Sequence, residues 1–247
     1  MVQAFGAQQS EAQQFDIFSI DLRGHGKTTL PADPSSLHGF NTYGGDIAAF
    51  LDHEQREGWT VVGHSMGATA SVLAAAGRSD IRAIKLIEPV IVPKIIRNIA
   101  RLPIVRRIGK HHPMARNARR RRSQWTSVEE VYRRYAAKPV FKAWADGVLS
   151  DYLEDGLIRG ENGVTLSCHP NWESATFAAQ GHDFWGAFER LNASVSALIA
   201  KPEASTVSAG AREKLRSSGV FIEINHDIGH LVPMEKPALA ADFIAQA

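Results

Sequence analysis

The stretch WTVVGHSMGATASVLAAA, residues 59–76, decides the fold that this chain adopts. Its opening residues, Trp59–Val62, are aromatic or β-branched and form a short apolar run typical of a buried strand. Met66–Ala76 is rich in alanine and other helix-forming residues, and a glycine follows at position 77. We therefore expect a strand that passes directly into a helix at Ser65.

Ser65 stands between Gly63 and Gly67 at this turn. A serine in such an elbow adopts a strained backbone conformation that only small neighbours tolerate. Its hydroxyl then lies at the carboxyl edge of a sheet and at the positive end of a helix, where the N–H of Met66 can stabilise an oxyanion. The pattern predicts Ser65 as a nucleophile, with a structural serine turn as the alternative.

Length and composition are those of one enzyme-sized folded unit. The chain has 247 residues, of which 44% are hydrophobic and 22% are charged. The single cysteine, Cys168, excludes an intramolecular disulfide framework and a cysteine-based zinc cluster. No apolar run reaches the roughly 18 residues of a membrane span, and the first residues lack the pattern of a signal peptide. We expect a cytoplasmic protein.

Charge is distributed unevenly along the chain. Pro89–Val128 contains no Asp or Glu but holds 11 of the 28 basic residues. Such a segment can bind nucleic acid, lie on a membrane surface, attract anionic substrates or simply form a solvated helix face. We favour the solvated face and expect no nucleic-acid partner, because the run lacks the interleaved aromatic residues that stack on bases.

Strands and helices alternate before and after the basic segment. Apolar runs separated by helices indicate a parallel sheet covered on both faces. The expected strands are Phe15–Asp21, Thr60–His64, Ile81–Glu88, Val195–Ala200 and Val220–Asn225, and the expected helices are Gly45–His53, Met66–Ala76, Arg212–Ser217 and one from Met234 to the end.

The middle of the chain has a different pattern. Val128–Ala137, Phe141–Leu153 and Trp172–Gln180 show helical spacing of large apolar residues, with no clear strand among them. We expect residues 1–92 and 192–247 to form an α/β core and residues 93–191 to form a helical insertion.

A serine hydroxyl needs a base, and a carboxylate must orient that base. His230 is the best placed of the ten histidines, because it follows the last predicted strand in a glycine-containing loop. Loops at the carboxyl ends of parallel strands share one edge of the sheet, so His230 can reach the edge that carries Ser65. His226 is the local rival.

Four motifs of this sequence resemble those of the α/β-hydrolase superfamily, in the branch of esterases, lipases and C–C hydrolases with a helical cap. They are Asp21–Thr28 (DLRGHGKT), Gly63–Gly67 (GHSMG), Leu86–Pro89 (LIEP) and Gly229–Leu231 (GHL). The resemblance implies a mostly parallel, doubly wound sheet and a Ser–acid–His triad. Ser65 disfavours the relatives with an aspartate nucleophile, the haloalkane dehalogenases and epoxide hydrolases.

The resemblance also implies that the insertion covers the active site as a cap. Candidate substrate-binding residues are then His64 in the elbow and five aromatic residues of the insertion. These five are Phe141, Trp144, Tyr152, Phe177 and Trp185.

The triad acid has two candidates. Many relatives carry it in the turn after the strand that here ends at Ala200, where Glu203 is the carboxylate. Some relatives place a glutamate at the end of the strand after the nucleophile helix, where this chain has Glu88. We favour Glu88, because a carboxylate that ends an apolar strand is costly to bury without a partner. Glu203 stays as the alternative.

The sequence departs from the superfamily at its start. The resemblance implies three strands before Phe15, the third followed by a His-Gly loop that donates a second oxyanion N–H. Only 14 residues precede Phe15, and Phe5-Gly6 is the candidate remnant of that loop. We expect an N-terminally shortened sheet and one missing oxyanion donor.

The expected function is hydrolysis of a small ester-like molecule through an acyl-enzyme, without metal or organic cofactor. Two alternatives remain open. The same triad serves C–C bond hydrolases, and a hydrolase fold with impaired catalysis can act as a binding protein. The sequence leaves the substrate and the oligomeric state undetermined.

Overall fold

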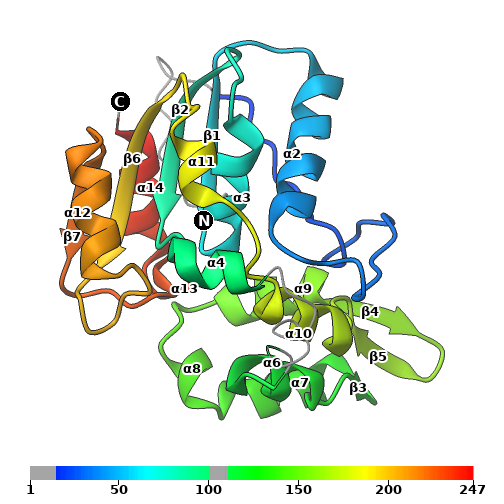
Figure 1. Ribbon diagram of the computed structural model, residues 1–247. Coiled ribbons are helices and arrows are strands. Elements are labelled where there is room, and N and C mark those ends of the chain that lie inside the picture. Colours follow the sequence, from blue (N-terminus) through cyan, green and yellow to red (C-terminus); the bar gives the residue numbers. More distant parts are fainter. Residues whose placement is uncertain (1–14, 101–108, 110, 247) are drawn as a thin grey trace. The chain divides into compact units, whose positions relative to one another are not determined.

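The computed structural model describes residues 15–100, 109 and 111–246, in two compact units (Figure 1). Unit 1 comprises the described residues of Met1–Ile20, Asn41–Pro93 and Asp183–Ala247. Unit 2 comprises those of Asp21–Phe40 and Lys94–His182. The division differs in detail from the expected boundaries, because Asp21–Phe40 joins the insertion and residues 183–191 join the core.

A four-stranded parallel sheet forms the centre of unit 1. Its strands, in spatial order, are β1 (Trp59–His64), β2 (Ile81–Ile87), β6 (Ser194–Ala200) and β7 (Phe221–Asn225). The register pairs His64 with Ile87 and Ile87 with Leu198, so neighbouring strands end level with one another. The loops that follow these strands therefore meet at one edge of the sheet.

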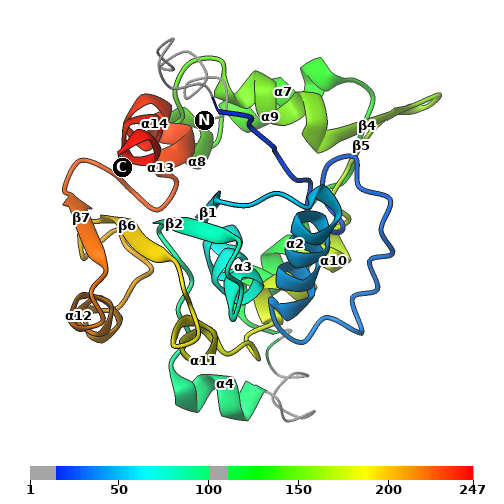
Figure 2. The ribbon, with the colours of Figure 1, turned by 90° about the horizontal axis from the view of Figure 1, so that it is seen from above.

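Helices cover both faces of this sheet. Figure 2 shows α3, α11 and α12 on one side and α13 and α14 on the other. The helices of unit 1 are α2 (Asn41–Glu54), α3 (Met66–Ala75), α11 (Phe184–Phe188), α12 (Ala209–Ser217), α13 (Val232–Glu235) and α14 (Pro237–Ala245).

The core of unit 1 lies between the sheet and these helices. Ile84, Leu86 and Ile199 are fully buried in β2 and β6. Helix α3 is apolar on nearly all sides, as expected for a helix packed between a sheet and other helices. Burial of this apolar surface stabilises the position of the elbow that precedes α3.

Most elements of unit 1 follow the sequence expectation within a few residues, but the strand expected at Phe15–Asp21 is absent. Phe15–Ile20 forms no helix or strand, and β1 is the last strand of the described sheet on that side. Phe18 instead packs edge-on against Phe50 and Trp59, and Arg56 pairs with Asp16. An apolar run forms a strand only where a neighbouring strand accepts its hydrogen bonds. The Phe5-Gly6 remnant lies outside the described residues.

Unit 2 is mostly helical, but it also contains a small antiparallel sheet that the sequence analysis missed. The sheet has the order β3-β5-β4. The elements of unit 2 are α4 (Lys94–Ala100), α6 (Pro113–Arg119), β3 (Gln124–Trp125), α7 (Val128–Ala136), α8 (Pro139–Lys142), α9 (Val148–Gly156), β4 (Leu157–Gly160), β5 (Gly163–Leu166) and α10 (Pro170–Ala178).

A tight hairpin explains the missed strands. β4 and β5 are joined through Glu161 and Asn162, and Gly160 pairs with Gly163 across the turn. Gly163 has φ of 121°, and a Cβ there would lie 2.2 Å from the carbonyl oxygen of Trp125. The turn-forming residues of Gly160–Gly163 (GENG) stand between two short apolar runs, and this hairpin signal was obscured by the helical periodicity around it.

Unit 2 has its own core and its own ion pairs. Trp125, Val131, Tyr135 and Leu153 belong to one buried cluster. Within the basic segment, Arg121 donates to both carboxylate oxygens of Glu173, at 2.8 and 2.9 Å. Part of the basic run is therefore paired with carboxylates of the same unit.

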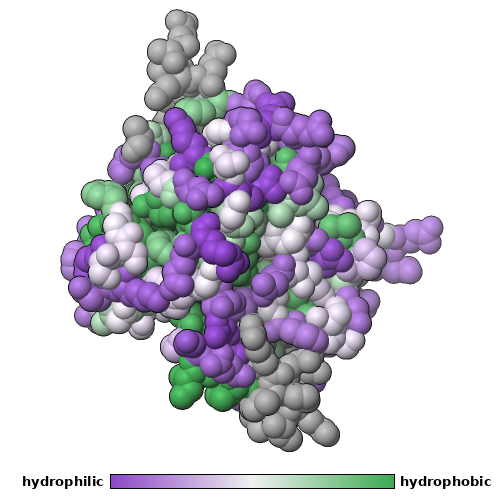
Figure 3. Space-filling model, turned by 45° about the horizontal axis from the view of Figure 1, so that its top comes forward, coloured by the Kyte–Doolittle hydropathy of each residue, from purple (hydrophilic) through white to green (hydrophobic). Residues whose placement is uncertain are grey.

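Hydrophobic residues on the surface are scattered among polar ones on the face that Figure 3 shows. Ile95 and Phe221 are the most exposed large apolar side chains among the described residues, at 70% and 63%. In the described part of the chain, no helix is long and apolar enough to span a membrane.

Candidate active site

The elbow after β1 holds Ser65 in a strained conformation. Ser65 has φ of 53° and ψ of −116°, a region that non-glycine residues rarely adopt. Its N–H donates to the carbonyl oxygen of Ile87 at 2.9 Å, so the residue remains tied to β2 beyond the end of the strand. Such strain persists only where surrounding contacts over-determine it.

The two glycines of the elbow have different roles. A Cβ at Gly63 would lie 2.5 Å from the backbone of Gly67 and Ala68, so only glycine fits. A Cβ at Gly67 would have no such neighbour within 4 Å among the described residues. The expectation that both glycines serve the same steric purpose is therefore wrong for Gly67, because its Cβ would point away from the elbow backbone.

The structure brings Ser65, His230 and Glu88 together at the carboxyl edge of the sheet. The Nε2 atom of His230 lies 3.0 Å from the Ser65 Oγ. The Nδ1 atom of His230 lies 3.2 Å from Oε2 of Glu88. Ser65 follows β1, Glu88 follows β2, and His230 lies in the loop after β7. The parallel register of these strands accounts for the meeting of the three residues.

The contacts determine which nitrogen of His230 carries a proton. A carboxylate only accepts hydrogen bonds, so Nδ1 must donate to Glu88. In the neutral ring the Nε2 lone pair then faces the Ser65 hydroxyl. This tautomer is the one that can accept a proton from serine.

Glu88 is fully buried, yet the balance of interactions favours its ionised form. Burial alone would raise the pKa of this carboxyl, but hydrogen bonds from His230, Thr206, Ala200 and Ser205 outweigh that effect and lower the pKa. Glu88 also has φ of 48°, a second strained residue at this edge. Its N–H donates to the carbonyl oxygen of Leu198 at 3.0 Å.

The turn after β6 supplies donors to Glu88, which the sequence analysis did not anticipate. Oε1 accepts from the N–H of Ala200 at 2.8 Å and from the Ser205 hydroxyl at 2.7 Å. Oε2 accepts from the N–H of Thr206 at 3.0 Å and from its hydroxyl at 3.3 Å. Two hydroxyl residues in the turn where many relatives carry an acid were the available signal. Glu203, the alternative acid, is exposed in this same turn.

The other candidate residues of unit 1 occupy distinct positions. Met66 is the first residue of α3, so its N–H has no acceptor earlier in the helix. The His64 ring lies against the main chain of His230, at 2.7 Å from Nε2 to the carbonyl oxygen. His226 is exposed. Trp185 packs edge-on against Phe184, with ring centroids 5.2 Å apart.

The remaining candidate substrate-binding residues lie in unit 2. Phe141 contacts Trp144, and Trp144 contacts Tyr152, with ring centroids 4.7 and 5.5 Å apart. Phe141 also stacks on Tyr135 of the buried cluster. Phe177 lies in α10 and is partly buried. The described ring contacts of Phe141, Trp144 and Tyr152 are those of an aromatic cluster within the unit.

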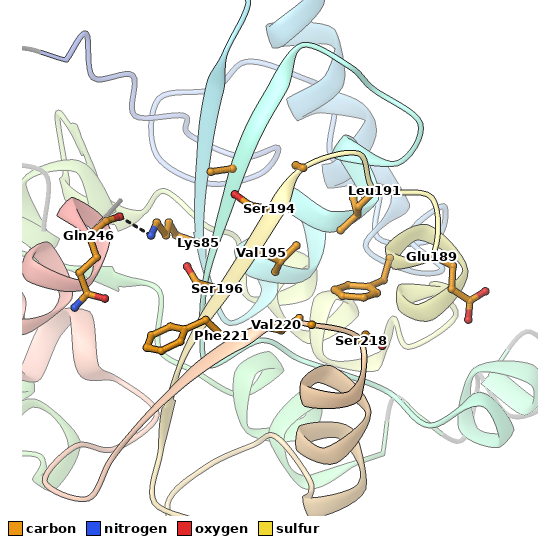
Figure 4. Close-up of a pocket in the computed structure, with 14 residues that line it drawn as sticks. Lys85, Glu189, Leu191, Ser194, Val195, Ser196, Ser218, Val220, Phe221 and Gln246 are labelled. Carbon is orange, nitrogen blue, oxygen red and sulfur yellow. Dashed lines mark hydrogen bonds between the residues drawn. The ribbon is translucent and has the colours of Figure 1, made fainter.

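A pocket of about 780 Å³ lies at the opposite end of the sheet (Figure 4). Its lining includes Ala83, Ser194 and Phe221, near the amino-terminal ends of their strands. The five residue-to-residue steps from Ala83 to Glu88 span roughly 16 Å of extended chain. This pocket is therefore separate from the site at Ser65.

The described residues offer little to a metal or to thiol chemistry. Among them, no group of three or more His, Cys, Asp or Glu side chains is arranged to hold a metal ion. Burial raises the pKa of the Cys168 thiol to about 12, so it stays protonated near neutrality.

The parallel sheet, the strained serine between strand and helix and the converging histidine and carboxylate define the class of protein: an α/β-hydrolase fold. The profile of a family described as Serine aminopeptidase, S33 matches residues 4–145. The chain belongs to this family and is a hydrolase of the α/β-hydrolase superfamily.

Solved structures share the fold at low sequence identity. E-2-(acetamidomethylene)succinate hydrolase aligns with a TM-score of 0.70 and 19% identity, over 90% of this chain and 77% of its own. The peroxisomal α/β-hydrolase Lpx1 from Saccharomyces cerevisiae aligns with a TM-score of 0.71 and 14% identity, over 90% and 63%. A malate-bound thermophilic esterase from Thermogutta terrifontis aligns with a TM-score of 0.59 and 17% identity, over 90% of this chain and 75% of its own. A comparison with curated protein sequences found no significant match.

The elbow can be tested by comparing its two glycines. Gly63→Ala should destabilise the protein by about 1–3 kcal/mol, because its Cβ would collide with rigid backbone. Gly67→Ala should change the free energy of unfolding by less than about 1 kcal/mol, because its Cβ enters open space and alanine favours a helix. Urea unfolding of both variants measures the difference, and equal destabilisation would contradict the steric argument.

The donors on Glu88 can be tested through the pH dependence of stability. The folded-state pKa lies below the unfolded value of about 4.5, so the stabilisation by ionised Glu88 is complete above that value. It is lost as the pH falls through the folded pKa. Ser205→Ala should therefore cost about 1.5–3 kcal/mol at neutral pH, as for a hydrogen bond to a charged group, and less once Glu88 is protonated.

Ser208→Ala is the matched control for that experiment. Ser208 is in the same loop, but its hydroxyl caps α12 by accepting from the N–H of Ala211 at 3.2 Å. Its removal should cost about 1 kcal/mol with no dependence on the ionisation of Glu88. If the cost of Ser205→Ala were also constant with pH, the hydroxyl would not stabilise the carboxylate.

Proposed function

We propose that this hydrolase cleaves ester bonds of small molecules through an acyl-enzyme, with Ser65, His230 and Glu88 as a catalytic triad. One observation carries the proposal. A continuous series of contacts runs from the Ser65 hydroxyl to Nε2 of His230 at 3.0 Å and from Nδ1 to Glu88 at 3.2 Å.

Acylation begins when Ser65 Oγ attacks the ester carbonyl while Nε2 of His230 takes its proton. The resulting imidazolium is stabilised by Glu88, which remains ionised. The N–H of Met66 donates to the oxyanion of the tetrahedral intermediate. The imidazolium then protonates the leaving alcohol, and the ester becomes a serine ester of the enzyme.

Deacylation repeats these steps with water. His230 takes a proton from the water as it attacks the acyl carbonyl, and the second tetrahedral intermediate collapses when Ser65 leaves. The carboxylic acid is released and the proton returns to Oγ. The strained conformation of Ser65 supports this role, because such strain in non-glycine residues clusters at functional sites.

We further propose that unit 2 selects the substrate as a cap. Its main segment, Lys94–His182, leaves unit 1 shortly after β2 ends next to Glu88. An insertion that departs from the carboxyl edge of a parallel sheet starts at the edge where such folds bind ligands. Phe141, Trp144 and Tyr152 are the residues to vary when substrate range is measured.

An amide substrate is the second candidate, because the matching family is described as a serine aminopeptidase. Ester and amide hydrolysis can be compared by measuring the rates with p-nitrophenyl esters and with aminoacyl p-nitroanilides at equal concentrations. Preference for the anilides would replace the ester proposal while leaving the triad intact. Cleavage of a β-diketone with neither of these activities would instead favour C–C hydrolysis.

The triad assignment is tested by three substitutions. Ser65→Ala should lower the kcat for p-nitrophenyl acetate by at least about 10³-fold, since it removes the nucleophile. Glu88→Gln should lower kcat by about 10²–10⁴-fold, since the neutral amide no longer balances the imidazolium. Glu203→Gln should leave kcat within about twofold.

Two outcomes would contradict these roles. Full activity of Ser65→Ala would remove Ser65 from the mechanism, and a large loss in Glu203→Gln with none in Glu88→Gln would exchange the acids. Failure of a fluorophosphonate to label Ser65 in the folded wild-type protein would favour a binding protein with impaired catalysis.

A further inference from the structure

His64 is the last residue of β1 and immediately precedes Ser65. Its ring belongs to the elbow, yet its Nε2 lies 2.7 Å from the main-chain carbonyl oxygen of His230. The two imidazole rings lie 5.1 Å apart at an angle of 43°. The residue beside the serine therefore contacts the backbone of the residue that carries the base.

The direction of this hydrogen bond follows from its partners. A carbonyl oxygen only accepts, so Nε2 of His64 carries a proton and donates. Burial, and to a lesser degree the neighbouring His230, lowers the pKa of His64 to about 4, while the hydrogen bond to the His230 carbonyl and the Glu88 carboxylate oppose this shift. The ring is thus neutral near pH 7, with its single proton on the nitrogen that faces His230.

Several contacts hold the loop that carries His230. Ile228 is buried in a cluster with Ile87 and Leu198, and the Thr206 hydroxyl oxygen lies 3.4 Å from Nδ1 of His230. The loop runs from the end of β7 to α13, and Gly229 donates its N–H to Oε2 of Glu235 at 3.2 Å. Oε2 of Glu88 lies within hydrogen-bond distance of the His230 ring. Among the described residues, His64 is the side chain that hydrogen-bonds to the main chain of His230 itself. It therefore limits the movement of the Cα about which the imidazole pivots.

We propose that His64 is a positioning residue, whose Nε2–H holds the carbonyl of His230 so that the imidazole stays within reach of both Ser65 and Glu88. This inference rests on the proposed triad. It gives the His64 ring a different role from the substrate contact expected from the sequence. Displacement of a catalytic group by about 1 Å can cost about 10²-fold in rate, so one backbone anchor can have a large effect.

Three substitutions separate the position of the donor from polarity and size. The amide nitrogen of glutamine can occupy the place of Nε2, whereas that of asparagine matches Nδ1 and falls short of the carbonyl. His64→Leu and His64→Asn should lower kcat for p-nitrophenyl acetate and butyrate by about 10–100-fold. The loss in kcat should be equal for the two esters, and the KM of each variant should stay within about threefold of the wild-type KM. His64→Gln should recover most of the lost rate, and His53→Leu, at an exposed histidine of α2, should match the wild type.

A second readout does not depend on turnover. Nitrogen NMR of the His230 side chain reports which ring nitrogen is protonated and whether the ring exchanges between orientations. We expect a single Nδ1–H state in the wild type and in His64→Gln, and exchange broadening in His64→Asn. The comparison of His64→Gln with His64→Asn tests the inference even if His64→Leu fails to fold.

Each result has one meaning. Equal kcat and equal His230 spectra in all His64 variants would overturn the inference. A rise in KM that depends on acyl chain length, with unchanged kcat and spectra, would make His64 a substrate contact and also overturn it. A wild-type protein that neither hydrolyses the esters nor reacts with fluorophosphonate would refute the proposed function, while the spectra would still show whether His64 orients His230.

Discussion

The buried carboxylate of Glu88 is the constraint on which this site depends. A carboxylate without solvent exposure is stable only when hydrogen bonds replace its lost hydration. Here Ala200, Ser205 and Thr206 supply four donors from the end of β6 and the turn that follows, and Nδ1 of His230 supplies another. One side chain on β2 thus joins the turn after β6 to the loop after β7.

Backbone strain at the site is maintained by the same sheet. Ser65 and Glu88 both adopt positive φ, at 53° and 48°, immediately after β1 and β2. Each donates its N–H to the adjacent strand, to Ile87 and Leu198 respectively. The ladder of hydrogen bonds therefore extends one residue beyond each strand and holds the residue that turns away. The cost of each strained residue, of order 1–3 kcal/mol, is offset by packing of the strands and α3 behind it.

Sequence reasoning succeeded where the physical signal is local. The apolar strand, the elbow and the alanine-rich helix around Ser65 depend on neighbouring residues, and they were predicted within one residue. It failed at Phe15–Asp21, whose apolar pattern has no adjacent strand to pair with among the described residues. It also failed at the hairpin of β4 and β5, whose turn residues were outweighed by surrounding helical periodicity. In both cases the secondary structure depends on which segments pack against each other, and local sequence patterns do not specify this.

By itself the sequence determined the class of fold, the residue type in the elbow and the order in which serine, acid and histidine follow along the chain. Only the tertiary structure decided which carboxylate lies against His230, which nitrogen of each ring carries its proton, and that the His64 ring contacts His230. The reason is physical separation: these contacts join residues up to 166 positions apart. Hydrogen bonds of about 3 Å between such residues depend on strand register and loop packing, which no short stretch of sequence specifies.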